Sequence, residues 1–108
     1  MNSVDPSGRI SDRSLLTTLG WTTGDRLAVT ADGTRMIIFH REDGAPHALI
    51  HNARISIPAS LRRRCGIRAR DRVLLAANRE LDLVVVYTQS ALEEALSTLH
   101  QADAEADR

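Results

Sequence analysis

The stretch RISIPASLRRRCGI at residues 54–67 decides the fold class of this chain. Pro58 suits the first turn of a helix, where its missing N–H costs no hydrogen bond. Gly66 suits the left-handed residue that often ends a helix. A short helix is therefore expected over about residues 59–65, after a strand that begins at Arg54. Because Arg62, Arg63 and Arg64 follow one another in it, this helix is strongly basic.

The same pattern occurs earlier in the chain, so the sequence contains an internal repeat. The triplet RIS at residues 9–11 recurs at residues 54–56, and Asp25-Arg26-Leu27 recurs as Asp71-Arg72-Val73. In both copies an apolar stretch, a polar turn and a second apolar stretch follow, and β-branched runs such as Val84-Val85-Val86 favour strands. Each copy therefore predicts a strand, a short helix and a β-hairpin, with repeat 1 at about residues 8–40 and repeat 2 at about residues 47–88.

One such unit cannot close a core alone, whereas two hairpins can close a small barrel. We expect a single, mainly β domain with short helices: a flexible N-terminus at residues 1–7, a barrel at 8–88, a C-terminal amphipathic helix at 89–100 and a disordered acidic tail at 101–108. Ser90 and Glu93 form a capping box at the start of that helix. Its leucines fall at helical spacing and are expected to pack on the protein's own barrel, with a partner chain as the alternative: Leu92, Leu96 and Leu99.

Charge is distributed unevenly along a chain whose formal net charge is zero. Residues 54–72 contain seven arginines and one acid, whereas residues 89–108 contain five acids and one arginine. The chain has no lysine, so every fixed cation is a guanidinium, whose planar fork of donors matches phosphates and guanine edges. This basic centre indicates a polyanionic partner.

Several other function classes are disfavoured by the sequence. No secretory signal and no membrane-spanning stretch is present, and the only cysteine, Cys65, excludes an internal disulfide and fits a reducing cytoplasm. His47 and His51 lack a third metal ligand, and no catalytic constellation or cofactor motif occurs, so we expect neither an enzyme nor a bound cofactor. Trp21 is interpreted as a core residue. The repeated acids Asp25 and Asp71 are interpreted as turn-fixing residues.

Residues 54–67, followed by Asp71-Arg72-Val73, resemble the signature of the AbrB/MazE/SpoVT swapped-hairpin family of DNA-binding proteins. The resemblance covers roughly residues 8–88 and is specific in the second copy. It implies a barrel made from two interleaved units, which the family usually takes from two chains. Here both units lie in one chain, as in the MraZ branch, so the barrel is expected to close within one chain or between two.

The resemblance implies a cytoplasmic, sequence-specific transcriptional regulator that binds double-stranded DNA as a homodimer or as a pseudo-dimeric monomer. Leu16 and Thr17 stand in the first copy where Arg62 and Arg63 stand in the second, so the two copies are unequal. Two alternatives remain. One is an antitoxin-type protein whose C-terminal helix and acidic tail engage and neutralise a toxin partner, and which also represses its own operon. The other is a scaffold that no longer binds DNA. The residues expected to contact DNA are Arg9, Arg13, Arg54, Arg62, Arg63, Arg64 and Arg68.

Overall fold

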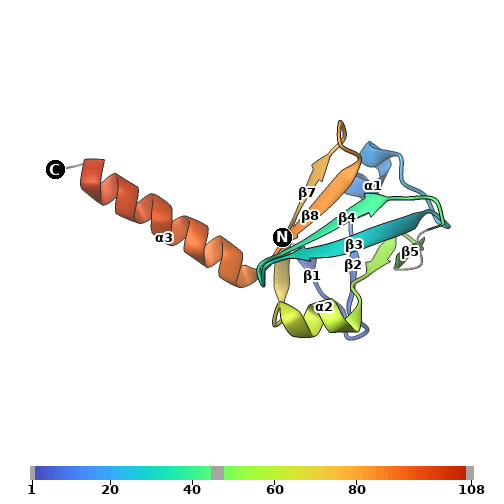
Figure 1. Cartoon of the computed structure of the whole chain (residues 1–108), viewed down its shortest axis with the longest axis horizontal. Coiled ribbons are helices and arrows are strands. Elements are labelled where there is room, and N and C mark those ends of the chain that lie inside the picture. The colour runs from blue at the N-terminus through green and yellow to red at the C-terminus, as the bar shows by residue number, and fades with distance from the viewer. Residues whose placement is uncertain (1, 45–47, 107–108) are drawn as a thin grey trace.

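The structure, a computed structural model, describes residues 2–44 and 48–106 and is mainly strand with short helices (Figure 1). The first half contains β1 (Asn2–Ser3), β2 (Arg9–Ser11), α1 (Arg13–Leu19), β3 (Arg26–Asp32) and β4 (Met36–Arg41). The second half contains β5 (Ala48–His51), β6 (Arg54–Ser56), α2 (Ala59–Arg64), β7 (Arg72–Asn78) and β8 (Leu83–Tyr87), and α3 (Gln89–Ala106) follows. Each half is thus the predicted strand, helix and hairpin, preceded by one further strand.

The two halves are interleaved by antiparallel strand pairing. The strands β2 and β6 pair with Ile10 opposite Ile55, and β4 and β8 pair with Ile38 opposite Val85. The first strand of each half joins the third strand of the other, because β1 pairs with β7 and β5 pairs with β3. An approximate two-fold axis therefore relates the halves and passes near the Ile10–Ile55 and Ile38–Val85 pairs.

The strands do not close into a barrel. Their order is β1-β7-β8-β4-β3-β5-β6-β2, which makes two antiparallel sheets joined by the short β3–β5 pairing. β1 and β2 stand at the two ends of this order, and no ladder joins them in the described part of the chain. Both residues of β1 are already paired with β7. The Asn2 side-chain amide donates to the Ser11 carbonyl and the Asp5 N–H donates to the Arg9 carbonyl, each at 2.9 Å, but these two bonds do not make a strand pairing. The expectation of a closed barrel is therefore wrong.

The core lies between the sheets and includes the N-terminal segment. Alternation along β4 and β8 buries one set of side chains completely: Ile37, Phe39, Val84 and Val86. Val4 is only 1% exposed and donates its N–H to the Asp71 carbonyl at 2.9 Å. The prediction of a flexible N-terminus is wrong for residues 2–4, because β1 pairs with β7 and Val4 belongs to the core.

The short helices begin and end at residues that favour helix ends. The Asp12 carboxylate accepts the Leu15 N–H at 3.0 Å, which caps α1, and Gly20 ends that helix with φ 72°. Pro58 immediately precedes α2, and Gly66 follows it with φ 64°. These two helices are therefore confirmed.

The C-terminal helix differs from its prediction in three ways. It starts after Thr88, whose side-chain oxygen accepts the Ala91 N–H at 3.3 Å, so Thr88 and not Ser90 is the cap. It continues to residue 106, where a disordered tail was expected, and residues 107–108 lie outside the described part. It also projects away from the body (Figure 1), with Leu96 57% and Leu99 60% exposed. The buried Thr88 is the only residue between β8 and α3, so the helix leaves along a fixed direction and its leucines do not reach the core.

No helix in the described part of the chain is long and apolar enough to cross a membrane.

Candidate nucleic-acid interface

The strands β2 and β6 form a two-stranded ribbon whose outer face carries one arginine from each repeat. Ile10 and Ile55 are buried in the core, and side chains alternate along a strand, so their neighbours point outward. Arg9 lies next to Ile10, and Arg54 lies next to Ile55. The antiparallel register places these two arginines diagonally across the ribbon, on either side of the approximate two-fold axis.

The basic helix α2 lies beside Arg9, although the two belong to different repeats. The Arg62 Nε donates to the Ile57 carbonyl at 3.0 Å, and the Ile57 N–H donates to the Gly8 carbonyl at 2.9 Å. The Arg62 guanidinium packs so closely on Gly8 that a Cβ there would lie 2.4 Å from its Cζ. The arginines of α2 are therefore fixed next to the start of β2.

The helix α1 occupies the corresponding place beside Arg54. A solvent-open cavity of about 450 Å³ lies between α1 and the turn that leads into β6. Leu16 lines this cavity at the position equivalent to Arg62, and Ala53 lines it at the position equivalent to Gly8. Arg13 lies on its rim. Each helix thus lies beside the arginine strand of the other half, which the repeat alone does not reveal.

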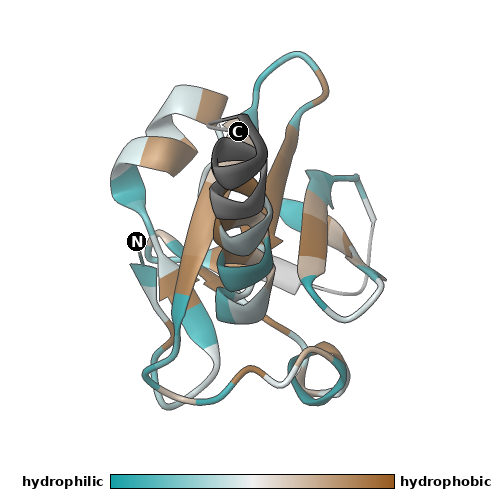
Figure 2. Cartoon of the chain, turned by 90° about the vertical axis from the view of Figure 1, so that its left-hand side faces the viewer, coloured by the Kyte–Doolittle hydropathy of each residue, from teal (hydrophilic) through white to brown (hydrophobic). Residues whose placement is uncertain are grey.

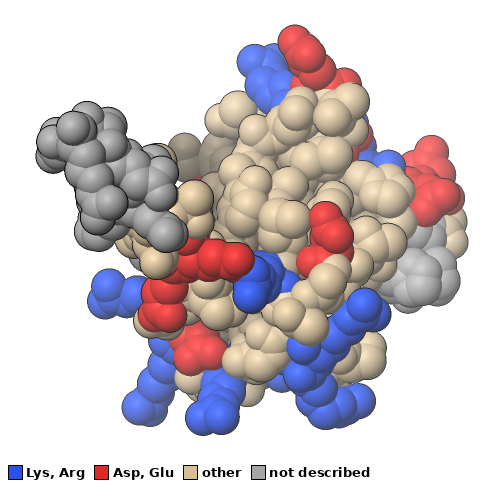
Figure 3. Space-filling view, turned by 60° about the vertical axis from the view of Figure 1, so that its left-hand side comes forward, with Lys and Arg blue, Asp and Glu red and all other residues tan. Residues whose placement is uncertain are grey.

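The two ends of this surface differ in charge. The α2 end carries Arg62, Arg63 and Arg64, whereas α1 carries only Arg13. In Figure 3 arginine side chains protrude along the lower edge of the view, at the height of α2 in Figure 1. Arg63 is exposed, while the Nε of Arg64 donates to the Gly33 carbonyl at 3.1 Å, in the turn between β3 and β4. The α2 end is therefore the stronger site for a polyanion.

Asp5 neutralises part of the charge at the α2 end. Its Oδ2 lies 3.2 Å from the Arg9 Nε, and its Oδ1 accepts the backbone N–H of Arg9 and of Ser7, each at 2.9 Å. The hydrogen bond from the Arg9 backbone is the main reason why the pKa of Asp5 lies below its ordinary value, with the Ser7 N–H and the Arg9 guanidinium acting in the same direction. Asp5 was not among the residues predicted from the sequence, although it stands four residues before Arg9.

The remaining site arginines are exposed. Within residues 2–44 and 48–106, no acceptor engages the guanidinium groups at four positions: Arg13, Arg54, Arg63 and Arg68. These groups are available to phosphates without first losing a partner inside the protein. Arg62 and Arg64, in contrast, each use one N–H to hold α2 in place.

Three of the other sequence interpretations concern residues outside this surface. The Asp25 carboxylate accepts the Thr22 N–H at 2.9 Å, and the Asp71 carboxylate accepts the Arg68 N–H at 2.8 Å, so both repeated acids fix turns as predicted. Trp21 is only 3% exposed, which confirms it as a core residue. His47 lies outside the described residues, so the His47–His51 pair is not resolved.

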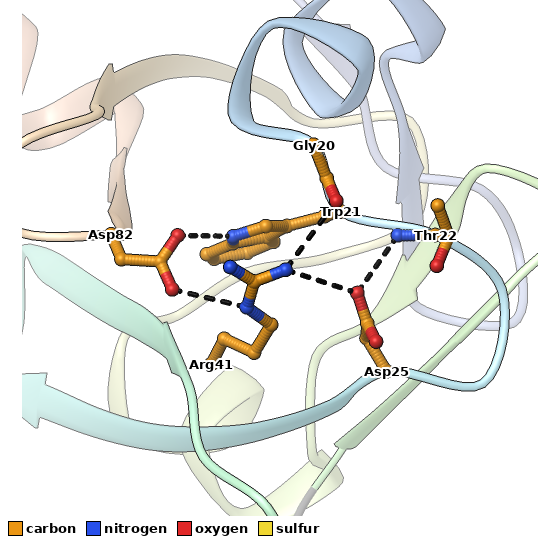
Figure 4. A network of polar contacts seen from close by, with 6 residues as sticks. All are labelled: Gly20, Trp21, Thr22, Asp25, Arg41 and Asp82. Atoms are coloured by element: carbon orange, nitrogen blue, oxygen red, sulfur yellow. Dashed lines mark hydrogen bonds and ion pairs between the residues drawn. The ribbon is translucent and has the colours of Figure 1, made fainter.

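A polar network fastens the β7–β8 turn to the first half (Figure 4). The Trp21 indole N–H donates to Asp82 at 2.7 Å, and the Arg41 Nε donates to the other oxygen of Asp82 at 3.1 Å. Arg41 also lies 3.5 Å from Asp25. All of these charges are paired with one another, so the network serves the fold.

Comparison of the chain with protein-family models, with curated proteins and with solved structures gave no match.

Proposed function

We propose that this protein is a sequence-specific, double-stranded DNA-binding regulator of transcription with the swapped-hairpin arrangement of the AbrB family. The observation that carries the proposal is the outward-facing Arg9 and Arg54 pair on the β2–β6 ribbon, with the arginines of α2 beside Arg9. Strand exchange between the halves supports the family assignment, because each repeat completes the sheet of the other.

The arginine chemistry suits a DNA backbone. Guanidinium groups bind phosphates through paired N–H donors and release counterions, so their binding weakens as the salt concentration rises. Sequence preference requires additional contacts to base edges, which an arginine forms best with guanine in the major groove. Arg54 and Arg63 are exposed on the ribbon and on α2, and we assign the main contacts to them.

The two ends of the surface contribute unequally in this proposal. Asp5 offsets the charge of Arg9, and α1 has Leu16 and Thr17 where α2 has Arg62 and Arg63. One chain therefore presents a strong half-site at α2 and a weak one at α1. A binding site for one chain is expected to be asymmetric in sequence.

The test is a titration of labelled duplex DNA from upstream of the protein's own gene, followed by fluorescence anisotropy at two salt concentrations. We expect selective binding relative to an unrelated duplex, with an affinity that falls steeply with salt. Arg54→Ala and Arg63→Ala should each weaken binding roughly tenfold and lower the salt slope by about one unit.

The matched control is Arg79→Ala. Arg79 is an exposed arginine in the turn between β7 and β8, at the opposite end of the molecule from α2 (Figure 1). Its replacement should change the affinity by less than about twofold, because it lies outside the proposed contact surface. Absence of binding to either duplex at low salt, or an equal loss for Arg79→Ala, would refute the proposal.

A further inference from the structure

Three exposed leucines lie on α3 or beside it. Four large hydrophobic side chains are exposed among the described residues. Three of them belong to this group: Leu74 is 38% exposed, Leu96 57% and Leu99 60%. The fourth, Leu81, is 66% exposed in the distant β7–β8 turn. Single exposed leucines are common, whereas a cluster of them marks an interaction surface.

Leu74 and Leu99 line a groove of about 730 Å³ between α3 and the outer face of the sheet, and Leu96 lies on the same helix outside the groove lining. Its sheet side is an apolar row across β4, β8 and β7, because Met36 pairs with Tyr87 and Tyr87 pairs with Leu74. Its helix side includes Ala91 and Ala95, one turn apart, whose small side chains leave room for a bulky group. Figure 2 looks along α3 and shows apolar strand segments behind the helix.

The body of the protein borders one side of α3 over part of the helix length. The helix residues that line the groove lie between Ala91 and Leu99 of the 18-residue helix, and the body residues that line it are Arg35, Met36, Leu74 and Tyr87. Helices in water owe most of their stability to packing of an apolar face, yet Leu96 and Leu99 remain more than half exposed within one chain. The helix therefore requires a surface that one chain does not supply.

We propose that α3 of a second copy of this chain fills the groove, so that the protein is a homodimer. The geometry is self-complementary: each chain offers both an apolar groove and, on the helix that borders it, the exposed side chains of Leu96 and Leu99. A two-fold arrangement places the Leu96 and Leu99 side chains of each copy over the Ala91 and Ala95 positions of the other, which satisfies both surfaces at once.

The charges at the rim of the groove fit the same occupant. Arg35 stands on the sheet side and Glu94 on the helix side, where they form an ion pair within one chain. A two-fold axis brings the sheet side of one groove against the helix side of the other, so that Arg35 of one chain faces Glu94 of the second copy. A partner helix of a single charge sign would instead leave one of the two rim groups unmatched.

This dimer is inferred from α3 and its groove alone and does not depend on DNA binding. If the proposed function also holds, the dimer presents two strong α2 half-sites, and its preferred DNA site is a repeat of the single-chain site. The two proposals can therefore fail separately, because one is tested by mass and the other by DNA affinity.

The test is the molar mass of the full chain in solution, by sedimentation velocity from about 1 µM to about 100 µM. We expect a mass of two chains, and a melting temperature that rises with protein concentration. Leu96→Glu combined with Leu99→Glu should give a single-chain mass, because two carboxylates then lie at the apolar contact. The far-ultraviolet circular dichroism of this variant should keep the strand signal and lose helix, which distinguishes dissociation from global unfolding.

The control is Leu81→Glu, which places one glutamate on a leucine that is 66% exposed and lies outside the groove. This variant should remain a dimer. A wild-type chain that has a single-chain mass at the highest concentration would overturn the proposal. A double variant that keeps its strand signal and still has a two-chain mass would also overturn it.

Discussion

The guanidinium of Arg62 lies against Gly8, and this contact joins the basic helix of the second repeat to the arginine strand of the first. Gly8 adopts φ 78°, and the space above its α-carbon is filled by the Arg62 side chain. Arg62 thus has a structural role in addition to its expected role at the DNA. Its replacement by alanine is expected to lower stability as well as DNA affinity.

Gly8→Ala should destabilise the protein by about 2 kcal/mol. The left-handed φ costs an alanine about 1 kcal/mol, and displacement of Arg62 from the Ile57 carbonyl loses a hydrogen bond worth about 1 kcal/mol. The measurement is urea unfolding followed by Trp21 fluorescence. Gly20→Ala is the control for φ alone, because Gly20 has φ 72° and open space at its Cβ position.

A double-mutant cycle separates the two contributions to the Gly8→Ala effect. In an Arg62→Ala background no guanidinium remains to be displaced, so Gly8→Ala should cost about 1 kcal/mol less than in the wild-type background. Equal costs in the two backgrounds would show that the Arg62 contact contributes nothing to the stability of this junction.

Asp82→Ala should destabilise the fold by about 2 to 3 kcal/mol. The change removes the acceptor of the Trp21 indole and of the Arg41 Nε, and Asp82 itself has φ 53°, which alanine tolerates poorly. Asp82→Asn is the matched control, since asparagine keeps an acceptor and suits a left-handed residue. The emission maximum of Trp21, the only tryptophan, should shift in the alanine variant and stay close to wild type in the asparagine variant. Equal unfolding free energies for the two variants would contradict this assignment.

The short elements were predictable because their signals are local. Asp12, Pro58 and the glycines at positions 20 and 66 fix the ends of α1 and α2 through neighbouring backbone groups. The β1 strand was missed because two residues carry no periodic pattern, and it is specified only by its pairing with β7. The projection of α3 away from the body was also not predicted, because it too depends on the position of another element. Leucine spacing predicts an apolar helix face, whereas the surface that this face meets depends on the direction in which β8 ends.

The composition of the candidate site was predictable, and its arrangement was not. The clustering of arginines in residues 54–72 is visible in the sequence. The neighbours of each arginine depend on strand exchange: Arg9 of the first repeat lies beside α2, and Arg54 of the second lies beside α1. Spacing within one repeat carries no information about contacts between repeats, so the Arg62–Gly8 contact could not be predicted from the sequence.

Cys65 should react slowly with thiol reagents in the native protein. Its side chain is 8% exposed, and burial raises the pKa of the thiol above its ordinary value of 9.0, against a smaller lowering by Arg64. Only the thiolate is nucleophilic, so modification by a disulfide reagent at neutral pH should be at least roughly tenfold slower than in denaturant. The rate of Cys65 modification in the folded protein should rise with pH until the protein unfolds in alkali. Equal rates in the native and denatured states would place Cys65 at the surface.

Asp5→Asn should change both the acid stability of the protein and its affinity for DNA. The pKa of Asp5 is lower in the folded protein than its ordinary value of 3.8, so its ionised form contributes stability that is present above this value. That contribution is lost as the pH falls through the lowered pKa. Melting temperatures should therefore differ between wild type and Asp5→Asn at neutral pH, and the difference should shrink in acid below pH 3.8.

The same change should strengthen DNA binding, because Arg9 then keeps its full charge on the ribbon. We expect an affinity gain of about threefold at low salt and a smaller gain at high salt, as for any added phosphate contact. Glu80→Gln removes one exposed carboxylate from the β7–β8 turn and should leave the affinity within about twofold. An equal gain for Glu80→Gln would mean that the effect arises from net charge. No gain in affinity for Asp5→Asn would mean that Arg9 does not contact DNA and that Arg54 is the one arginine of the β2–β6 ribbon that does.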